Sequence, residues 1–588
     1  MRLVMRIFVC LVAVLGVAAG IYLAVSRSGG KPAQDSEQAL AAARLDSDKE
    51  RAIWAAEHNT FEIERRFGPA FLQALVAGDS VRLDSFLFDD ASCGDQTATA
   101  PRQVGNGQLR VEKWETEDSV RPLSRDDWAA GLVAQAAMFQ KVTSSRLRVL
   151  EITADPPPGQ WTTSLLLTLT GRDDQNVLLQ FESHSQVVFQ VQDEQQLASR
   201  PSIRSWSTRS KRLRAAQRTL MKEVTRQSGL DRMPLADNWK LSVNEARLQQ
   251  FQMAVADYDR DGHLDIAVSP LAGRPLLLRG RGQMRFDEVG RRARLASVPG
   301  GTLRRQFLAT WIDYDDDGYP DLICGSRLYH NDSGSRFTDV TANSGLEFST
   351  EPMGCVVADY DCDGLLDLYV LYQEVPDGNR GETKRPQWVD DSTVGRDNHL
   401  WHNEGGGRFR NVTASSRAGG GRRDSFAAAW LHYDDDHWPD LYVANDFGRN
   451  VLLRNRGDGT FQDISDRCGA DGFATSMGVA IGDVNNDGRS DVYVANMYSK
   501  MGRRIIGMVG ADDYPDGIYS QIQGSCAGNR LYLRSGSDSP FADHSASMGV
   551  NAVGWAYAPV MFDVDNDGFL DMYATTGFMS FDRKKPDG

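Results

Sequence analysis

From about residue 221 to the end, short apolar runs alternate with polar turns in a repeating order. Each unit contains an apolar strand, the acidic element D-x-D-x-D-G-x-x-D and a second apolar strand such as DLYVAN. The pattern N-x-L-x-x-N-x-G follows, and the unit closes with F-x-D-V-T or a variant of it. Four short strands in about 45–55 residues are typical of one blade of a β-propeller. The pattern therefore predicts a mainly β propeller over 221–588.

The acidic element occurs six times, and its copies begin at residues 257, 313, 359, 432, 483 and 563. The closing aromatic residue recurs at Phe286, Phe337, Phe409, Phe461 and Phe541. Two of the intervals are long because polar insertions, roughly 373–397 and 499–528, lie between the second and third strands of their units. Insertions at one place in a repeat are expected to project from one face of the array. Six blades can be counted in this way.

Before the repeats, the chain has the pattern of a small α+β domain over 31–200. Helices are predicted from Glu37 to about Leu87 and over 126–140, with a loop over 89–110 between them. Four strands should follow: Arg146–Ile152, Trp161–Leu169, Val177–Glu182 and Gln186–Val191. Helices followed by an antiparallel meander indicate an α+β fold. The basic stretch 201–220 is interpreted as a solvated linker helix.

One part of this domain carries a family resemblance. The stretch AFLQALVAGDSVRLDSFLFDDAS is similar to the opening helices of cone-shaped NTF2-like domains. The resemblance implies an enclosed pocket, and therefore a small-molecule binding or catalytic domain. Asp84, Asp89 and Asp90 lie near the end of its helices, but nothing in the sequence makes them a site.

The first 30 residues form a separate segment. Arg2 and Arg6 precede Ile7–Val25, which contains no charged residue. A helix of that length spans about 28 Å, close to the thickness of a bilayer core. A signal peptide cleaved near Ala19 is the alternative, but the apolar run continues past that point, which favours an uncleaved transmembrane anchor. Both interpretations place the remainder outside the cytoplasm, anchored in the cell envelope or extracellular.

The acidic elements have the residue types and spacing of calcium sites. Calcium takes six to eight oxygen ligands at about 2.3–2.6 Å, and alternate positions of a tight loop direct carboxylates inward. The glycine after the third acidic residue permits the sharp turn. Five loops supply a full set and would bind about five structural calcium ions. Their predicted ligands are Asp257, Asp259, Asp261, Asp265, Asp313, Asp315, Asp317, Asp321, Asp359, Asp361, Asp363, Asp367, Asp483, Asn485, Asp487, Asp491, Asp563, Asp565, Asp567 and Asp571.

Two other interpretations of these loops are weaker. An EF-hand needs a glutamate at its twelfth position and flanking helices. The twelfth positions here are Val268, Cys324, Val370, Val494 and Ala574, and the flanking residues have the pattern of strands. A merely solvated acidic face is also disfavoured, because four carboxylates within nine residues repel one another without a cation.

The fourth acidic element departs from the others. His432 replaces its first aspartate and His437 replaces its glycine, while Asp434, Asp436 and Asp440 remain. Because imidazole is a poor calcium ligand, this loop is predicted to be empty or weak. His402 is interpreted as a strand residue and not as a metal ligand, because other units fill the same position with Arg279, His330 and Arg454.

The units resemble FG-GAP/VCBS repeats, the calcium-loop blades of integrin-α-type propellers. The segments NHLWHNEGGGRFRNVT and NVLLRNRGDGTFQDIS are similar to the bacterial group related to cartilage acidic protein, which often ends in an ASPIC/UnbV domain. The resemblance covers about 218–576 and implies a propeller that usually has seven blades. No ASPIC/UnbV segment is visible before Gly588, and the last unit stops after its second strand. Either Met221–Val224 completes that unit, or the chain is a truncated product.

Composition and motif content argue against some classes of function. A net charge of −15 argues against nucleic-acid binding, which selects basic surfaces. The sequence contains no HExxH, GxSxG or P-loop motif. Apart from Cys10, the cysteines are Cys93, Cys324, Cys355, Cys362, Cys468 and Cys526, an even number that an oxidising compartment could pair in 15 ways.

The expected function is that of a non-enzymatic, exported scaffold that binds a protein or glycan ligand. The alternative gives the chemistry to the N-terminal domain and uses the propeller as a targeting module. A third option is an accessory role in assembly or electron transfer, although no haem motif CxxCH supports direct redox chemistry.

Overall fold

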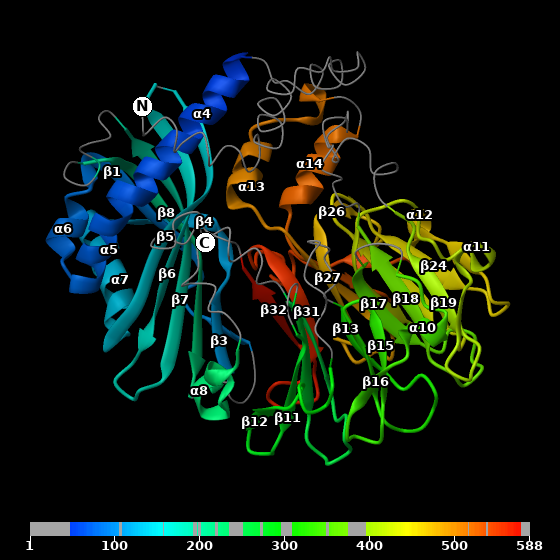
Figure 1. Ribbon diagram of the computed structural model, residues 1–588. Coiled ribbons are helices and arrows are strands. Elements are labelled where there is room, and N and C mark those ends of the chain that lie inside the picture. Colours follow the sequence, from blue (N-terminus) through cyan, green and yellow to red (C-terminus); the bar gives the residue numbers. More distant parts are fainter. Residues whose placement is uncertain are drawn as a thin grey trace, which may run out of the picture. The chain divides into compact units, whose positions relative to one another are not determined.

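The computed structural model describes residues 47–577 apart from gaps at 105–108, 157, 192–196, 198–200, 218–220, 235–250, 271–273, 296–307, 349–351, 374–395, 515–516 and 537–538. The chain divides into two compact units (Figure 1). Unit 2 contains 42–222 and 500–515, and unit 1 contains the rest. Among the described helices, none has the length and apolarity to cross a membrane. The predicted anchor or signal segment, Ile7–Val25, lies outside the described residues.

Unit 2 is an α+β fold whose helices precede and interrupt one large sheet. Its helices are α4 (Ser47–Glu62), a π-helical turn (Ile63–Phe67), α5 (Gly68–Ala77), α6 (Ser80–Asp84), α7 (Arg125–Ala137), α13 (Lys500–Ile506) and a 3₁₀ turn (Ala511–Asp513). Its strands are β1 (Leu87–Thr97), β2 (Arg102–Val104), β3 (Leu109–Trp114), β4 (Thr116–Leu123), β5 (Lys141–Asp155), β6 (Gln160–Arg172), β7 (Leu178–Gln190) and β8 (Ile203–Ala216). The strand order is β2-β3-β8-β7-β6-β5, and β1 joins β8 to β4.

Buried and partly exposed residues alternate along the strands, so this sheet has one buried face. Every second residue of β6 and β7 is buried. Aromatic rings from helices and strands fill the space beneath: Phe67 packs edge-on against Phe86 and Phe189, and Phe71 stacks on Trp206. The predicted helices over Glu37–Leu87 and 126–140 are confirmed within the described residues.

Three predictions for unit 2 are wrong. The two strands expected at Val177–Glu182 and Gln186–Val191 form one continuous strand, β7. The expected loop over 89–110 holds β1, β2 and the start of β3, and the expected linker helix over 201–220 is the central strand β8. The basic residues of β8 concealed its period of two, because they are not free solvated charges. Lys211 pairs with Asp95 at 2.6 Å, and Arg214 pairs with Glu182 at 2.8 Å. With these charges paired, the strand buries Trp206 and Leu213 between its neighbours.

The segment 500–515 lies within the predicted insertion 499–528, yet it belongs to unit 2. The guanidinium of Arg504 donates to both carboxylate oxygens of Glu57, at 2.8 and 2.6 Å, and to the carbonyl of Val149 at 3.1 Å. Both charged side chains of this pair are about nine-tenths buried. Lys49 also forms an ion pair with Asp513. Unit 2 is therefore built from two separate stretches of chain.

Unit 1 consists mainly of short antiparallel strands. The strands are β9 (Phe251–Ala256), β10 (Asp265–Pro270), β11 (Leu276–Gly280), β12 (Phe286–Glu288), β13 (Ala309–Ile312), β14 (Asp321–Cys324), β15 (Arg327–Asn331), β16 (Phe337–Asp339), β17 (Pro352–Ala358), β18 (Asp367–Tyr372), β19 (His399–Asn403), β20 (Phe409–Asn411), β21 (Ser425–Leu431), β22 (Asp440–Asn445), β23 (Gly448–Arg449), β24 (Val451–Asn455), β25 (Phe461–Asp463), β26 (Phe473–Ala474), β27 (Ser476–Gly482), β28 (Asp491–Asn496), β29 (Arg530–Leu533), β30 (Ala542–Asp543), β31 (Ala556–Phe562) and β32 (Asp571–Thr576). Its helices are α8 (Thr225–Ser228), a 3₁₀ turn (Leu230–Arg232), α10 (Thr341–Ser344), α11 (Thr413–Ser416), α12 (Ser465–Cys468) and α14 (Ile518–Cys526).

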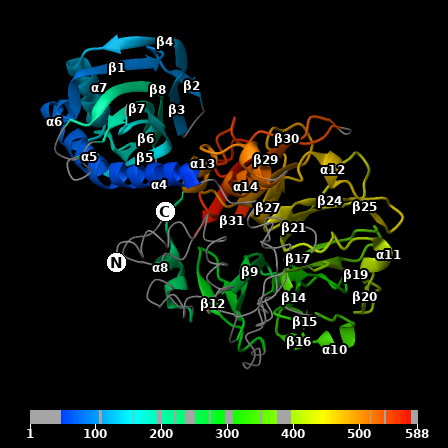
Figure 2. The same ribbon diagram turned by 90° about the horizontal axis from the view of Figure 1, so that it is seen from above.

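Five four-stranded meanders follow one another in unit 1, and each has the form of a propeller blade. They are β9–β12, β13–β16, β17–β20, β21-β22-β24-β25 and β27–β30. The first strands of consecutive blades are neighbours, and Figure 2 shows the blades in sequence order with these strands innermost. Both insertions lie where they were predicted, between second and third strands. The sixth unit has two described strands, β31 and β32.

Met221–Val224 is not a strand, so the predicted β-strand that would complete the last unit is absent at these described residues. The next residues nevertheless repeat the end of a blade. The short helix α8 begins after Val224 and ends at Gly229 with φ of 79°, just as α10 begins after Val340 and ends at Gly345 with φ of 76°. The segment therefore resembles the end of a blade in its short helix, which was not predicted, and the predicted strand before it is wrong.

The six described cysteines carry free thiols, so none of the pairings considered from the sequence is formed. Cys324 and Cys468 are buried, and burial raises the pKa of each thiol to about 11. Such thiols are apolar packing elements at neutral pH.

Removing the guanidinium of Arg504 should destabilise unit 2, because it would leave the Glu57 carboxylate buried without its partner. We expect Arg504→Ala to lower the free energy of unfolding by about 3–5 kcal/mol, the usual cost of breaking a buried ion pair. Denaturant unfolding of the full chain measures the change. Arg102→Ala, at an exposed position of strand β2 in the same unit, is the matched control and should cost at most about 0.5 kcal/mol. Equal losses from the two variants would contradict the assigned role.

Candidate metal centres in the acidic hairpin loops

The acidic elements form the hairpin loops between the first and second strands of each blade. We number them loop 1 (257–265), loop 2 (313–321), loop 3 (359–367), loop 4 (432–440), loop 5 (483–491) and loop 6 (563–571). In each loop the ninth residue is also the first residue of the second strand. The metal-ligand candidates predicted from the sequence therefore lie at positions one, three, five and nine of a strand-to-strand turn.

Five of the loops share one backbone conformation that requires positive φ at two positions. At position four φ is between 56° and 58°, and at position six, always glycine, it is between 83° and 93°. Position four of loops 5 and 6 is asparagine, which tolerates this region better than most residues. In loop 4 neither Asp435 nor His437 has positive φ. The predicted departure of loop 4 is therefore a different turn as well as a different residue set.

The aspartate at position one holds the turn closed. In loop 2, Oδ1 of Asp313 accepts a hydrogen bond from the backbone N–H of Asp317 at 3.1 Å, and Oδ2 accepts one from Gly318 at 3.0 Å. The same two bonds occur in loops 1, 3, 5 and 6. His432 cannot accept in this way, and in loop 4 the N–H of Asp436 bonds Asp434 instead.

The aspartate at position nine is fully buried in loops 1 to 5. In loop 2, Asp321 accepts from the N–H of Tyr314 at 3.2 Å and from the N–H of Asn331, on the third strand, at 2.7 Å. Burial raises the pKa of Asp321 and of Asp367 to about 7, because two backbone hydrogen bonds only partly offset the lost solvation. A cation beside such a carboxylate would favour its charged form.

Ligand atoms converge in the loops. Carboxylate oxygens lie within 4.8 Å of one another in three sets: Asp257, Asp259 and Asp265; Asp313, Asp315 and Asp317; and Asp359, Asp361 and Asp363. At position three, Oδ1 of Asp259, Asp315, Asp361 and Asp565 is buried and has no hydrogen-bond partner. These oxygens are free to bind a cation. In loop 5, Asn485 accepts from the N–H of Asp487 and donates to its carboxylate.

A residue of the third strand also points into the loop, which the sequence interpretation missed. We call it the cation position; the strand register places Arg279, His330, His402, Arg454 and Leu533 there in blades one to five. His330 and His402 each join a set of three ligand atoms with the aspartates at positions three and nine. His402 is thus a strand residue, as predicted, and also a potential metal ligand, which was not predicted.

Loop residues also connect neighbouring blades. The amide of Asn403, at the end of the third strand, donates to the carbonyl of Tyr314 in the preceding blade at 2.8 Å and to Leu366 in its own loop at 3.1 Å. Asn331 and Asn455 make the equivalent pair of bonds. The ring of Tyr314 packs on Phe409 of the next blade, with centroids 6.2 Å apart. The acidic loops are therefore part of the interfaces between blades.

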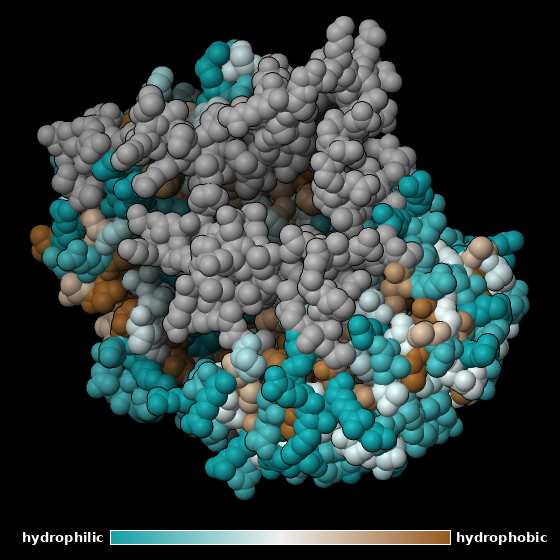
Figure 3. Space-filling model, viewed as in Figure 1, coloured by the Kyte–Doolittle hydropathy of each residue, from teal (hydrophilic) through white to brown (hydrophobic). Residues whose placement is uncertain are grey.

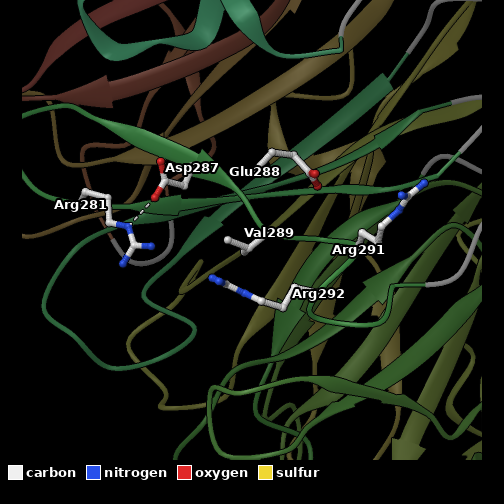
Figure 4. A pocket seen from close by; sticks show the side chains of 6 residues that line it. All are labelled: Arg281, Asp287, Glu288, Val289, Arg291 and Arg292. Carbon is white, nitrogen blue, oxygen red and sulfur yellow. Dashed lines mark hydrogen bonds and ion pairs between the residues drawn. The ribbon is translucent and has the colours of Figure 1, made fainter.

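An open cavity of about 590 Å³ lies on the first blade, and none of the loop carboxylates lines it. Arg281, Asp287, Glu288, Val289, Arg291 and Arg292 line it. Arg281 is paired with Asp287 at 2.8 Å, whereas Arg291 and Arg292 are exposed and form no ion pair with the described residues. Figure 4 shows the side chains of Arg281 and Arg292 directed towards one another and Arg291 turned the other way.

Comparison with known protein families identifies the repeats that carry these loops. The family model of the FG-GAP-like repeat matches residues 257–324, 313–370 and 432–494, so each match runs from an acidic loop through the strands that follow it. The chain therefore contains FG-GAP-like repeats, as the sequence motifs predicted.

Among individual proteins, the repeats are similar to cartilage acidic protein 1. The proteins of that name from Xenopus tropicalis and Homo sapiens are each 41% identical to this chain over 58 residues. The match covers 10% of this chain and 9% of each relative. This chain thus matches only a small part of the relatives' length.

The solved structures are less similar to this chain. The V. cholerae biofilm matrix protein Bap1 is 11% identical, with a TM-score of 0.26, over 52% of this chain and 40% of its own. A mutant of AofleA from Arthrobotrys oligospora is 10% identical, with a TM-score of 0.29, over 55% and 83%. AusH from Aspergillus nidulans is 11% identical, with a TM-score of 0.16, over 28% and 86%. Similarities this slight carry no argument about ligand or chemistry.

Removing the amide of Asn403 should weaken the contact between the second and third blades. We expect Asn403→Ala to cost about 1–3 kcal/mol of unfolding free energy, because it removes the donor to the buried carbonyl of Tyr314 and to the partly buried carbonyl of Leu366. Denaturant unfolding monitored by tryptophan fluorescence measures this. Asn343→Ala, at an exposed position of unit 1, controls for loss of an asparagine. A cost for Asn403→Ala no larger than for Asn343→Ala would show that the bond does not couple the blades.

Proposed function

We propose that the blades of unit 1 form a β-propeller stabilised by divalent cations, calcium among them, which its acidic loops hold, and that the propeller acts as a binding scaffold. One observation carries the proposal: clustered carboxylate oxygens recur at the same hairpin of successive blades. Clustered hard oxygen donors are the ligands that calcium prefers. Because the loops also connect the blades, a bound ion would stabilise the ring as well as its own hairpin.

Calcium should raise the thermal stability of unit 1. An ion that binds only the folded state at about 100 times its dissociation constant adds roughly 2.7 kcal/mol per site. The measurement is the unfolding midpoint of the full chain with excess calcium and with a calcium chelator. Asp487→Asn in loop 5 should reduce the calcium-dependent increase, whereas Asp436→Asn in loop 4 should leave it unchanged. Equal midpoints with calcium and with chelator would refute the metal proposal.

We further propose that the ligand of the scaffold is a protein or glycan that carries acidic groups. Seven arginines lie between residues 274 and 294 of a chain whose net charge is −15. Three of them are paired with carboxylates, and Arg285, Arg291, Arg292 and Arg294 form no ion pair with the described residues. Two of them, Arg291 and Arg292, border the cavity of the first blade. Over β11, β12 and β16, the described side chains on the face shown in Figure 3 are mainly hydrophilic. A polar, positively charged surface of this kind favours an anionic partner.

A pair of polysaccharides tests this second part. The full chain should bind immobilised dextran sulfate and not neutral dextran, and binding should weaken as salt rises, because exposed charges are screened. Replacing Arg291 and Arg292 together by alanine should lower the affinity for dextran sulfate several-fold. Arg327→Ala, which removes an arginine paired with Asp339 on the second blade, is the control. Equal binding by the double variant and the control would exclude the cavity as the site.

The remaining parts of the proposal rest on the sequence. Export, with attachment through Ile7–Val25, follows from the uncharged run of that segment. A non-enzymatic role follows from the lack of local catalytic motifs in the sequence. The alternative, a small-molecule function of unit 2, finds less support, because aromatic side chains fill its interior. Asp84 and Asp89 both pair with Arg125, and Asp90 pairs with Arg204, so these aspartates serve as ion-pair partners.

A further inference from the structure

We propose that the residue at the cation position decides which cation each acidic loop holds. An arginine at this position makes the loop independent of metal. A histidine makes the loop select a nitrogen-binding divalent metal such as Zn²⁺. A leucine leaves the loop carboxylates available to bind Ca²⁺. The inference rests on the proposed cation binding by the loops and assigns their selectivity. Loops 1 to 5 fall under the rule, because their blades have a described third strand.

In loops 1 and 4 an arginine takes the place of the metal. Nε of Arg279 lies 2.5 Å from Oδ2 of Asp259, and Nη2 lies 2.9 Å from Oδ2 of Asp261. Arg454 contacts Asp434 and Asp436 in the same way. The guanidinium thus bridges positions three and five, whose carboxylates a metal ion would use. Because arginine keeps its charge at any relevant pH, it repels a second cation.

In loops 2 and 3 the histidine is placed as a metal ligand. Nδ1 of His330 lies 3.2 Å from Oδ2 of Asp315 and 3.3 Å from Oδ1 of Asp321. In loop 3, Nδ1 of His402 lies 3.3 Å from Asp361 and 3.2 Å from Asp367. Neither Nδ1 makes an aligned hydrogen bond, although both are buried.

These separations match the geometry of a small tetrahedral ion. Two ligands about 2.0–2.1 Å from a tetrahedral zinc ion lie roughly 3.3 Å apart. Calcium binds at longer distances and takes oxygen in place of nitrogen. One imidazole and two carboxylates therefore suit zinc and its neighbours among the transition metals better than calcium.

Loop 5 lacks a basic residue at this position. Leu533 follows Tyr532 on β29, and none of the ion pairs among the described residues involves Asp483, Asp487 or Asp491. Its donors are three carboxylates and the amide of Asn485, all oxygen ligands. Of the five loops under the rule, this one has the donor set of a calcium site and no competing cation.

Metal content of variants at the cation position tests the rule. The metal-free full chain would be dialysed against Ca²⁺ or Zn²⁺, and bound metal per chain determined by elemental analysis. Leu533→Arg should lose one Ca²⁺, and Arg279→Leu should gain one. His330→Leu and His402→Leu should each lose one Zn²⁺. Arg327→Leu, on the third strand of blade two but paired with Asp339, should change neither number.

The outcomes separate the two proposals. If the wild-type chain binds no Ca²⁺, the proposed function fails. If it binds Ca²⁺ but Leu533→Arg and Arg279→Leu leave the number unchanged, the rule is overturned and the function stands. Unchanged Zn²⁺ content in both histidine variants overturns the assignment of loops 2 and 3. Arg454→Leu provides a second test of the arginine loops should Arg279→Leu fail to fold.

Discussion

The buried aspartate at position nine of loops 1 to 5 determines how its loop is attached to the rest of the blade. It accepts one backbone N–H from its own loop and one from the third strand, as Asp367 does from Tyr360 and Asn403. A carboxylate without solvent needs both donors, because an unpaired buried charge is costly. The loop is therefore held against the third strand of its blade. That contact brings the cation position beside the other carboxylates, so the candidate metal site is a consequence of how the hairpin is anchored.

The same anchoring connects loops 1, 2 and 3 to the next blade. The tyrosine at position two donates its N–H to the buried aspartate, accepts a hydrogen bond at its carbonyl from the following blade and packs its ring there. Tyr360 does all three, towards Asn455 and Phe461. In the fifth blade Arg534 replaces the asparagine and lies over the ring of Tyr433 instead. Repeat proteins gain stability from such nearest-neighbour contacts. A cation in one loop would therefore also strengthen the contact with the next blade.

The sequence predicted the features that are local and repeated. The strand–loop–strand order, the loop carboxylates and the abnormal loop 4 all follow from patterns within one unit, and the structure has them. The proximity of His402 to the loop carboxylates was not predicted because it depends on strand register, which places His402 opposite Asp367. The linking role of Asn403 was missed because its partner Tyr314 is 89 residues away. The strand β8 was missed because Lys211 and its basic neighbours conceal an alternating pattern that only their paired acids explain.

Side-chain differences between the acidic loops are informative because the backbone of these loops is nearly constant. Loops 1, 2, 3 and 5 share the turn, the closing aspartate and the buried aspartate, yet arginine, histidine or leucine completes them. The carboxylates held together in each loop repel one another, so each unit must supply a positive charge or bind a cation. Arg279 supplies a positive charge from the chain itself, whereas a loop with Leu533 would take its positive charge from an ion in solution. Under the proposed rule, variation at this one position would change how much of the propeller depends on metal without changing the fold of a blade.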